Sequence, residues 1–261
     1  MGDPIISNDF VDLGTITSIT EEAGYDDDNV EEYWHLKRRY RATATPKSDT
    51  DFLLKFDFGA AKSVVAVMLN DVNFDKARVR IHTADLGNNW AAADIDSSEL
   101  TVSLDERVNR YKIYIPVVGD KQWMVVQVPA AAGAVGDYQT KGEVGSVVVL
   151  DSIATFGKNA YARSAEDFYE EIKMPHGGIE RVGLGDNLQW IGEVMIDNRA
   201  ESDEAEFWAM NLLERSDPLI FYENRSVTDK VYLCVRDDAY EGNLIHQGLV
   251  KGNSIKFKEL V

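Results

Sequence analysis

A short run of basic and aromatic residues, 33–41, has the residue types best suited to binding chemistry. It reads Tyr-Trp-His-Leu-Lys-Arg-Arg-Tyr-Arg. Such a run suits a nucleic acid, through phosphate contacts and base stacking. It also suits a sugar, which packs on aromatic rings and bonds to arginine, or the acidic surface of a neighbouring subunit. The sequence favours the last, with four candidate subunit-interface residues: Trp34, Arg38, Arg39 and Arg41.

No motif in the sequence indicates catalysis. The four histidines are far apart, so neither HxxxH nor HExxH occurs. There is no GxSxG nucleophile elbow and no phosphate-binding glycine loop. The single cysteine, Cys234, excludes an internal disulfide and a cysteine-based zinc site, and its apolar neighbours favour an inert core position. We therefore expect neither an enzyme nor a bound cofactor.

The triplet Asp26–Asp28 is the one stretch that resembles a metal-binding loop. Counted from Asp26, the EF-hand positions that need Gly and Glu hold Glu31 and Lys37 instead. The EF-hand therefore fails, and only a looser calcium site stays open. A solvated turn is the simpler interpretation, and we predict no metal ligands.

The composition places limits on the class of protein. The 261 residues carry 27 Lys+Arg and 45 Asp+Glu, a formal net charge of −18. Such a charge repels phosphate backbones, so a nucleic acid is a poor partner for the surface as a whole. No apolar run approaches the length of a membrane span, and the first residues lack the features of a signal peptide. We expect a protein of a reducing compartment, because it has one cysteine.

Short alternating segments predict an antiparallel β-sandwich in the first part of the chain. They are separated by Gly, Asp and Asn turns with no strong helix between them. The segments are 52–58, 63–69, 78–83, 111–117, 122–128 and 145–156. We expect an extended arm at 1–20, the sandwich at 21–157 with a loop at 129–145, and a linker at 158–178.

The remaining residues, 179–261, predict a smaller α+β domain of the strand-helix-strand type. One convincing helix is expected at 202–215, because Ser202 can cap it and acidic residues follow in its first turn. Trp208 and Leu212 lie on one face of that helix, and Pro218 follows it. Strands are expected at 190–196, 219–222, 230–235 and 254–257.

Several of these segments resemble the galactose-binding-like (discoidin-type) jelly-roll family over about residues 20–157. The strand Phe52–Gly59 resembles the family's aromatic and Asp-containing strand. Residues 78–85, followed by Trp90, are similar to its "R-v-x-x-S-x-D-g-x-x-W" strand. Residues 110–114 and 123–126 resemble its late strands. The resemblance implies ligand contacts on variable loops at one end of the sandwich, and it carries over no residue as a ligand group. Our own candidate glycan contacts are Trp90 and Asp85.

A jelly roll with an N-terminal arm and a small second domain also resembles tail-tip or baseplate proteins of long-tailed bacteriophages. That resemblance implies a mainly-β virion component, assembled in the host cytoplasm into a homo-oligomeric ring with other tail proteins. Its jelly roll would be open to host-surface carbohydrate. The alternative function is a free carbohydrate-binding module, which predicts a monomer with exposed aromatic residues on the end loops.

Overall fold

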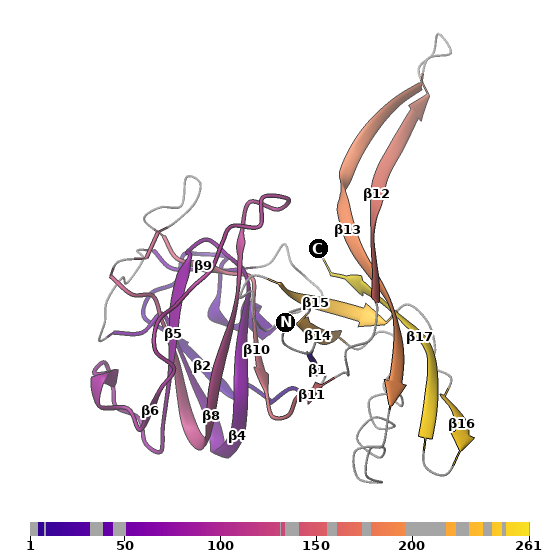
Figure 1. Cartoon of the computed structure of the whole chain (residues 1–261). Coiled ribbons are helices and arrows are strands. Elements are labelled where there is room, and N and C mark those ends of the chain that lie inside the picture. The colour runs from indigo at the N-terminus through magenta and orange to yellow at the C-terminus, as the bar shows by residue number, and fades with distance from the viewer. Residues whose placement is uncertain are drawn as a thin grey trace. The chain divides into compact units, whose positions relative to one another are not determined.

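The computed structural model of the chain, drawn in Figure 1, divides into two compact units. The first consists mainly of Ser7–Ile153 with Tyr222–Val231, and the second of Asp3–Ile6, Ala154–Phe221 and Tyr232–Val261. The structure describes residues 5–7, 9–31, 39–43, 51–130, 132–133, 141–155, 161–173, 179–196, 218–222, 230–236, 242–246 and 249–260.

The described residues of the first unit form antiparallel strands and two short 3-10 helices. Its strands are β2 (Thr15–Ser18), β3 (Tyr40–Arg41), β4 (Leu54–Val72), β5 (Lys76–His82), β6 (Ile95–Asp96), β7 (Leu100–Thr101), β8 (Tyr111–Gln127), β9 (Glu143–Val144) and β10 (Ser146–Leu150). The 3-10 helices are η1 (Asp27–Glu31) and η2 (Trp90–Ala92). The prediction of a mainly-β fold is confirmed.

Two long strands, β4 and β8, pair with each other over most of their length. The first part of β4 also pairs with β2, and its last part pairs with β10. The last part of β8 pairs with β5, and β5 pairs with β6. The pairing of β4 with β8 shifts register between Asp57 and Lys62, where β4 has extra residues. Each strand therefore contributes its two halves to different parts of the sheet (Figure 1).

Alternating side chains from both halves form one hydrophobic core. Leu54 and Phe56 of β4 and Met124 and Val126 of β8 belong to it, as does Ile113 at the other end of β8. Because both halves contribute to the same core, they face each other as the two layers of a sandwich. The intervening residues of each strand face outward, as the period of two in a β-strand requires.

The sequence located these strands but divided them wrongly. Segments 52–58 and 63–69 are parts of the single strand β4, and segments 111–117 and 122–128 are parts of β8. Gly59 has a φ of 71°, so the chain turns there without leaving the strand. The predicted arm at 1–20 also contains β2, which pairs with β4 through Ile16 and Phe56. The predicted loop at 129–145 ends in β9, which pairs with β3.

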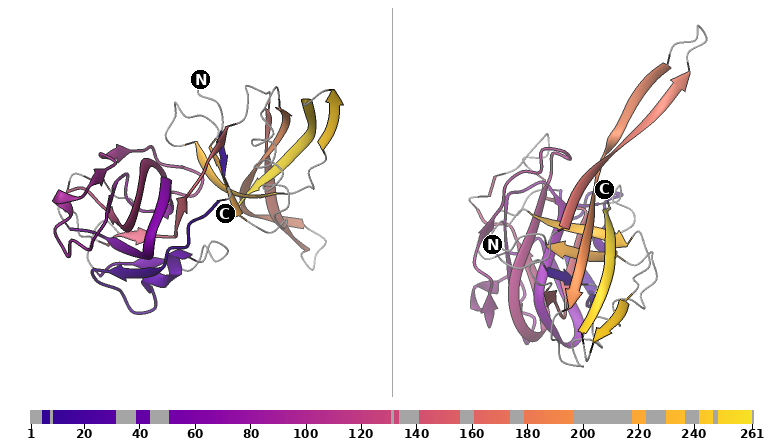
Figure 2. Two further views of the ribbon diagram at one scale, coloured as in Figure 1. Left: turned by 90° about the horizontal axis from the view of Figure 1, so that it is seen from below. Right: turned by 45° about the vertical axis from the view of Figure 1, so that its right-hand side comes forward.

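The second unit contains a β-sheet of eight strands in the described part of the chain. They are β1 (Ile5–Ser7), β11 (Ala154–Thr155), β12 (Tyr161–Lys173), β13 (Ile179–Ile196), β14 (Pro218–Tyr222), β15 (Val231–Arg236), β16 (Gly242–His246) and β17 (Leu249–Glu259). Their order is β11-β1-β14-β15-β17-β13-β12, with β16 added to β17. The long strands β12 and β13 twist around each other as a two-stranded ribbon (Figure 2).

The predicted linker at 158–178 is wrong, because most of it forms β12. Its 13 strand residues pair with β13 from Tyr161 opposite Gly192 to Lys173 opposite Ile179. The segment is predicted to be a linker because its composition is polar. A strand in a two-stranded ribbon has little apolar surface to bury, so polar side chains do not exclude it. The helix predicted at 202–215 lies outside the described residues.

Two glycines with the same backbone conformation provide a test of the β2–β4 contact. Gly14 and Gly24 both have positive φ, 66° and 84°. A Cβ at Gly14 would stand 2.1 Å from the backbone oxygen of Asp57, whereas a Cβ at Gly24 meets nothing within 4 Å. We predict that Gly14→Ala lowers the free energy of unfolding by about 3 kcal/mol, from strain plus overpacking, against about 1 kcal/mol for Gly24→Ala. Urea denaturation of the full chain measures both, and equal losses would contradict the close approach.

Candidate functional site

Trp123 lies on β8, the middle strand of the sheet β10-β4-β8-β5-β6 of the first unit, and it faces outward from the core. Its neighbours in the chain, Gln122 and Met124, flank it on β8, and Met124 faces the core. Across the strands Trp123 is opposite Asp57 of β4 on one side and His82 of β5 on the other. Directly paired residues share a face of the sheet, so both polar side chains flank the indole. Trp123 is partly exposed.

Charged groups surround this tryptophan on the same face. The Nζ of Lys55 lies 5.5 Å from the Trp123 ring centroid and 2.8 Å from Asp85 Oδ2. The carboxylate of Asp57 accepts hydrogen bonds from the Gln122 side chain at 2.8 Å and the Gly59 amide at 2.9 Å. These bonds fix the orientation of Lys55 and Asp57 beside the ring.

A second polar group joins the end of β5 to β8. Asp94 accepts hydrogen bonds from the Thr83 hydroxyl at 2.9 Å, and its Oδ2 lies 2.8 Å from Lys121 Nζ. The amide of Asp94 donates to Nδ1 of His82 at 3.1 Å. The hydrogen bonds from Lys121 and Thr83 lower the pKa of Asp94 to about 2, so it remains a carboxylate at neutral pH. We call Lys55, Asp57, His82, Asp85, Asp94, Lys121 and Trp123 the Trp123 face.

Trp90, a candidate glycan contact, is expected to be exposed on an end loop, and that expectation of exposure is wrong. Its side chain is 0% exposed, and its Nε1 donates to the carbonyl oxygen of Gly87 at 2.9 Å. It packs with Phe52 and Val125, and Trp123 packs against this group. Trp90 therefore supports the partly exposed ring of Trp123, a residue that the sequence analysis did not select. The alternating pattern of residues 122–128 already indicated the outward position of Trp123. Met124 and Val126 face the core, and a strand with a period of two then places Trp123 on the outer face.

Asp85, the other candidate glycan contact, does lie at the Trp123 face. Its side chain is 37% exposed, and it accepts a hydrogen bond from the Gly87 amide at 2.9 Å. Asp85 and Gly87 close a turn, and the carbonyl oxygen of Gly87 in this turn accepts the hydrogen bond from Trp90. Contact between Asp85 and a glycan stays a prediction.

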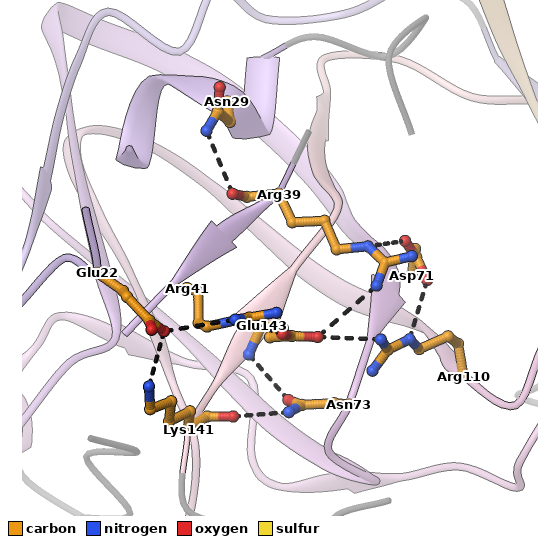
Figure 3. Close-up of polar contacts among 9 residues, drawn as sticks. All are labelled: Glu22, Asn29, Arg39, Arg41, Asp71, Asn73, Arg110, Lys141 and Glu143. Atoms are coloured by element: carbon orange, nitrogen blue, oxygen red, sulfur yellow. Dashed lines mark hydrogen bonds and ion pairs between the residues drawn. The ribbon is translucent and has the colours of Figure 1, made fainter. Parts of the chain in front are cut away.

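The described residues of the basic run, 39–41, lie in a different part of the first unit, around the buried side chain of Glu143. Figure 3 shows Arg39, Arg41 and Arg110 converging on Glu143, whose side chain is 0% exposed. Arg110 approaches it to 3.0 Å. Burying a carboxylate is costly unless it is paired, and three guanidinium groups provide the pairing. We call these residues, with Asp71, Glu22 and Lys141, the Glu143 ion cluster.

Two further carboxylates complete the Glu143 ion cluster. Asp71 lies 2.7 Å from Arg39 Nε and 3.5 Å from Arg110 Nε. Burial raises the pKa of Asp71, an effect that both arginines oppose. Glu22 lies 3.5 Å from Arg41 and 2.9 Å from Lys141 (Figure 3). The cluster thus ties Glu22, the segment 39–41 and residues 141–143 to the sandwich.

The predicted subunit interface is only partly described. Arg38 and Trp34 lie outside the described residues. Arg39 and Arg41 are described, and both pair with carboxylates of their own chain. Their charge is therefore matched within the chain, and a contact with the acidic surface of another subunit stays a prediction.

Among the described residues, no group of three or more His, Cys, Asp or Glu side chains could hold a metal ion, and Asp27 and Asp28 belong to η1. No helix of this part of the chain is long and apolar enough to cross a membrane. The thiol of Cys234 is buried and is not part of a disulfide.

Comparison with known proteins gives likenesses in structure alone. No protein-family model matches the chain, and a comparison with curated proteins finds no match. The chain is similar to chitosan-binding module 1 of a chitosanase/glucanase from Paenibacillus sp. IK-5, at 12% identity and a TM-score of 0.38. That likeness covers 55% of this chain and 98% of the module.

Two other solved structures resemble the same share of the chain. CBM32-3 from a family 31 glycoside hydrolase of Clostridium perfringens has 11% identity and a TM-score of 0.36, covering 53% of this chain and 88% of the module. The lectin domain of lectinolysin, complexed with Lewis B antigen, has 14% identity and a TM-score of 0.32, covering 53% and 93%. At such values the function has to be argued from the residues of the site.

The buried carboxylate of Glu143 should be essential to stability. We predict that Glu143→Ala lowers the free energy of unfolding by about 3 kcal/mol or more, because three arginines lose their shared partner. The matched control is Glu99→Ala, which removes an exposed partner of Arg78 at 3.0 Å and should cost about 0.5 kcal/mol. Urea denaturation of the full chain measures both variants. Losses of equal size would contradict a structural role for the Glu143 ion cluster.

The lowered pKa of Asp94 predicts a contribution to acid sensitivity. Its folded pKa of about 2 lies below the ordinary value of 3.8, so its stabilisation is present above pH 3.8 and is lost as the pH falls toward 2. We predict that Asp94→Asn loses stability less steeply than the unmodified protein over that interval. Thermal unfolding at successive pH values measures this difference, and parallel curves would contradict it.

Proposed function

We propose that the first unit is a carbohydrate-binding module of the galactose-binding-like jelly-roll type, and that it binds a sugar on Trp123. The observation that carries the proposal is the arrangement of the Trp123 face. A partly exposed indole lies between Asp57 and His82 on a rigid sheet. Sugar-binding sites need an apolar surface for the C–H face of the ring and a few polar groups for its hydroxyls.

The surroundings of the indole support this proposal. Trp90, Phe52 and Val125 pack beside Trp123 on the same side of the sheet, so that the position of Trp123 is fixed before a ligand arrives. A preformed site avoids the entropic cost of ordering side chains on binding. Asp57, Asp94 and Lys121 are held by hydrogen bonds and ion pairs at defined places around the ring. Their acceptors and donors match the hydroxyl groups of a sugar.

The proposal adopts the alternative of the sequence analysis rather than its main prediction. The structures that resemble this chain include carbohydrate-binding modules and a lectin domain, and they give a phage tail component no support. Ring assembly, other tail proteins and a virion location therefore rest on the sequence resemblance alone. The non-enzymatic interpretation is kept, since the proposed site binds a sugar without a bond being broken.

The test is glycan binding by the full chain and its variants. We predict that the unmodified protein binds oligosaccharides of galactose or glucosamine in calorimetric titrations, and that Trp123→Ala weakens binding about tenfold or more. The matched control is Tyr25→Ala, which removes another partly exposed aromatic ring, one that lies 4.0 Å from the Arg41 guanidinium. This control should bind as the unmodified protein does. Equal binding by the Trp123→Ala variant, or no binding by the unmodified protein, would refute the proposal.

A further inference from the structure

Lys121 of the Trp123 face lies directly opposite a second lysine, Lys62. Lys62 of β4 pairs in register with Lys121 of β8, which is two residues before Trp123 and therefore on the same face. Side chains in such a pair have Cβ atoms about 5 Å apart, and like charges at that distance destabilise a sheet. The arrangement is thus unfavourable for the folded protein alone.

Of these two lysines, only Lys121 has a carboxylate partner among the described residues. Lys121 lies 2.8 Å from the Asp94 carboxylate and bonds to Thr83 at 3.3 Å. Lys62 is exposed, and no described residue pairs with it. Its neighbour Ser63 is exposed as well, and Lys55 on the same strand is already paired with Asp85. Lys62 therefore presents an ammonium group that no carboxylate of the described chain neutralises.

This feature is unexpected in a chain with a net charge of −18. Carboxylates are abundant, yet those of the Trp123 face are paired with other groups and leave Lys62 without an ion pair in the described part of the chain. A ligand that carries an anionic group would pair with Lys62 when it binds. A neutral sugar would leave the charge of Lys62 without a partner.

We propose that the Trp123 face takes an acidic sugar, with its ring on Trp123 and its carboxylate or sulfate group on Lys62, close to Lys121. This inference rests on the proposed function and adds the class of ligand. The net charge of the chain opposes the approach of an anion from a distance. Selectivity therefore arises at short range, through contact with Lys62.

The experiment compares three galactose-based disaccharides that differ only at C6: galactose, galacturonate and galactose 6-sulfate. We expect the full chain to bind one of the two acidic forms about fivefold more tightly than the neutral form at low salt, a preference typical of an exposed ion pair. The preference should shrink at high salt, because exposed pairs are screened. Lys62→Gln should abolish the preference and leave the affinity for the neutral form unchanged.

The matched control is Lys76→Gln, which removes the same charge. Lys76 begins β5 and His82 ends it, so Lys76 is separated from the Trp123 face by the length of that strand. This variant should keep the full preference for the acidic form. If Lys62→Gln has no effect, or if a thymidine oligonucleotide competes as well as the acidic sugar, the inference is wrong.

The two proposals fail in different ways. Binding that requires Trp123 but is equal for all three sugars would overturn the acidic ligand and leave the carbohydrate-binding module intact. Absence of binding to all three, or binding that survives Trp123→Ala, would overturn both.

Discussion

The first unit depends on the antiparallel pairing of β4 with β8 across both layers of the sandwich. Every other strand of its main sheet is attached to this pair directly or through β5. The inward residues of the two strands supply much of the core. Their outward residues include Asp57, Lys62, Lys121 and Trp123. The same ladder therefore sets both the stability of the sandwich and the geometry of the proposed site.

Two kinds of interaction hold the remaining segments against this ladder. Near the site, Trp90 with its bond to Gly87 packs a loop onto the sheet by apolar contact. Elsewhere in the unit, Glu143 forms ion pairs with arginines from segments that are far apart in the sequence. The first contact is apolar and fixes a ring for stacking. The second is ionic and centred on the buried carboxylate of Glu143, and it joins segments that are far apart in the sequence.

The sequence predicted the β class and most strand positions, because alternating apolar residues are a local signal. It missed the continuity of β4 and β8, since a turn at Gly59 within a strand has the same local appearance as a strand end. It chose Trp90 rather than Trp123 because exposure depends on what a loop covers. The pairings of Arg39 with Asp71 and of Lys62 with Lys121 join distant segments, and composition alone did not reveal them.

The central claim is that a sugar ring stacks on Trp123, and the indole N–H signals of the full chain test it most directly. They are recorded by two-dimensional NMR during titration with the galactose-based disaccharides, and Trp123→Phe and Trp90→Phe identify two of the signals. The account predicts a saturable shift of the Trp123 signal, with little change at buried Trp90. A saturable binding curve with an unmoved Trp123 signal would contradict it.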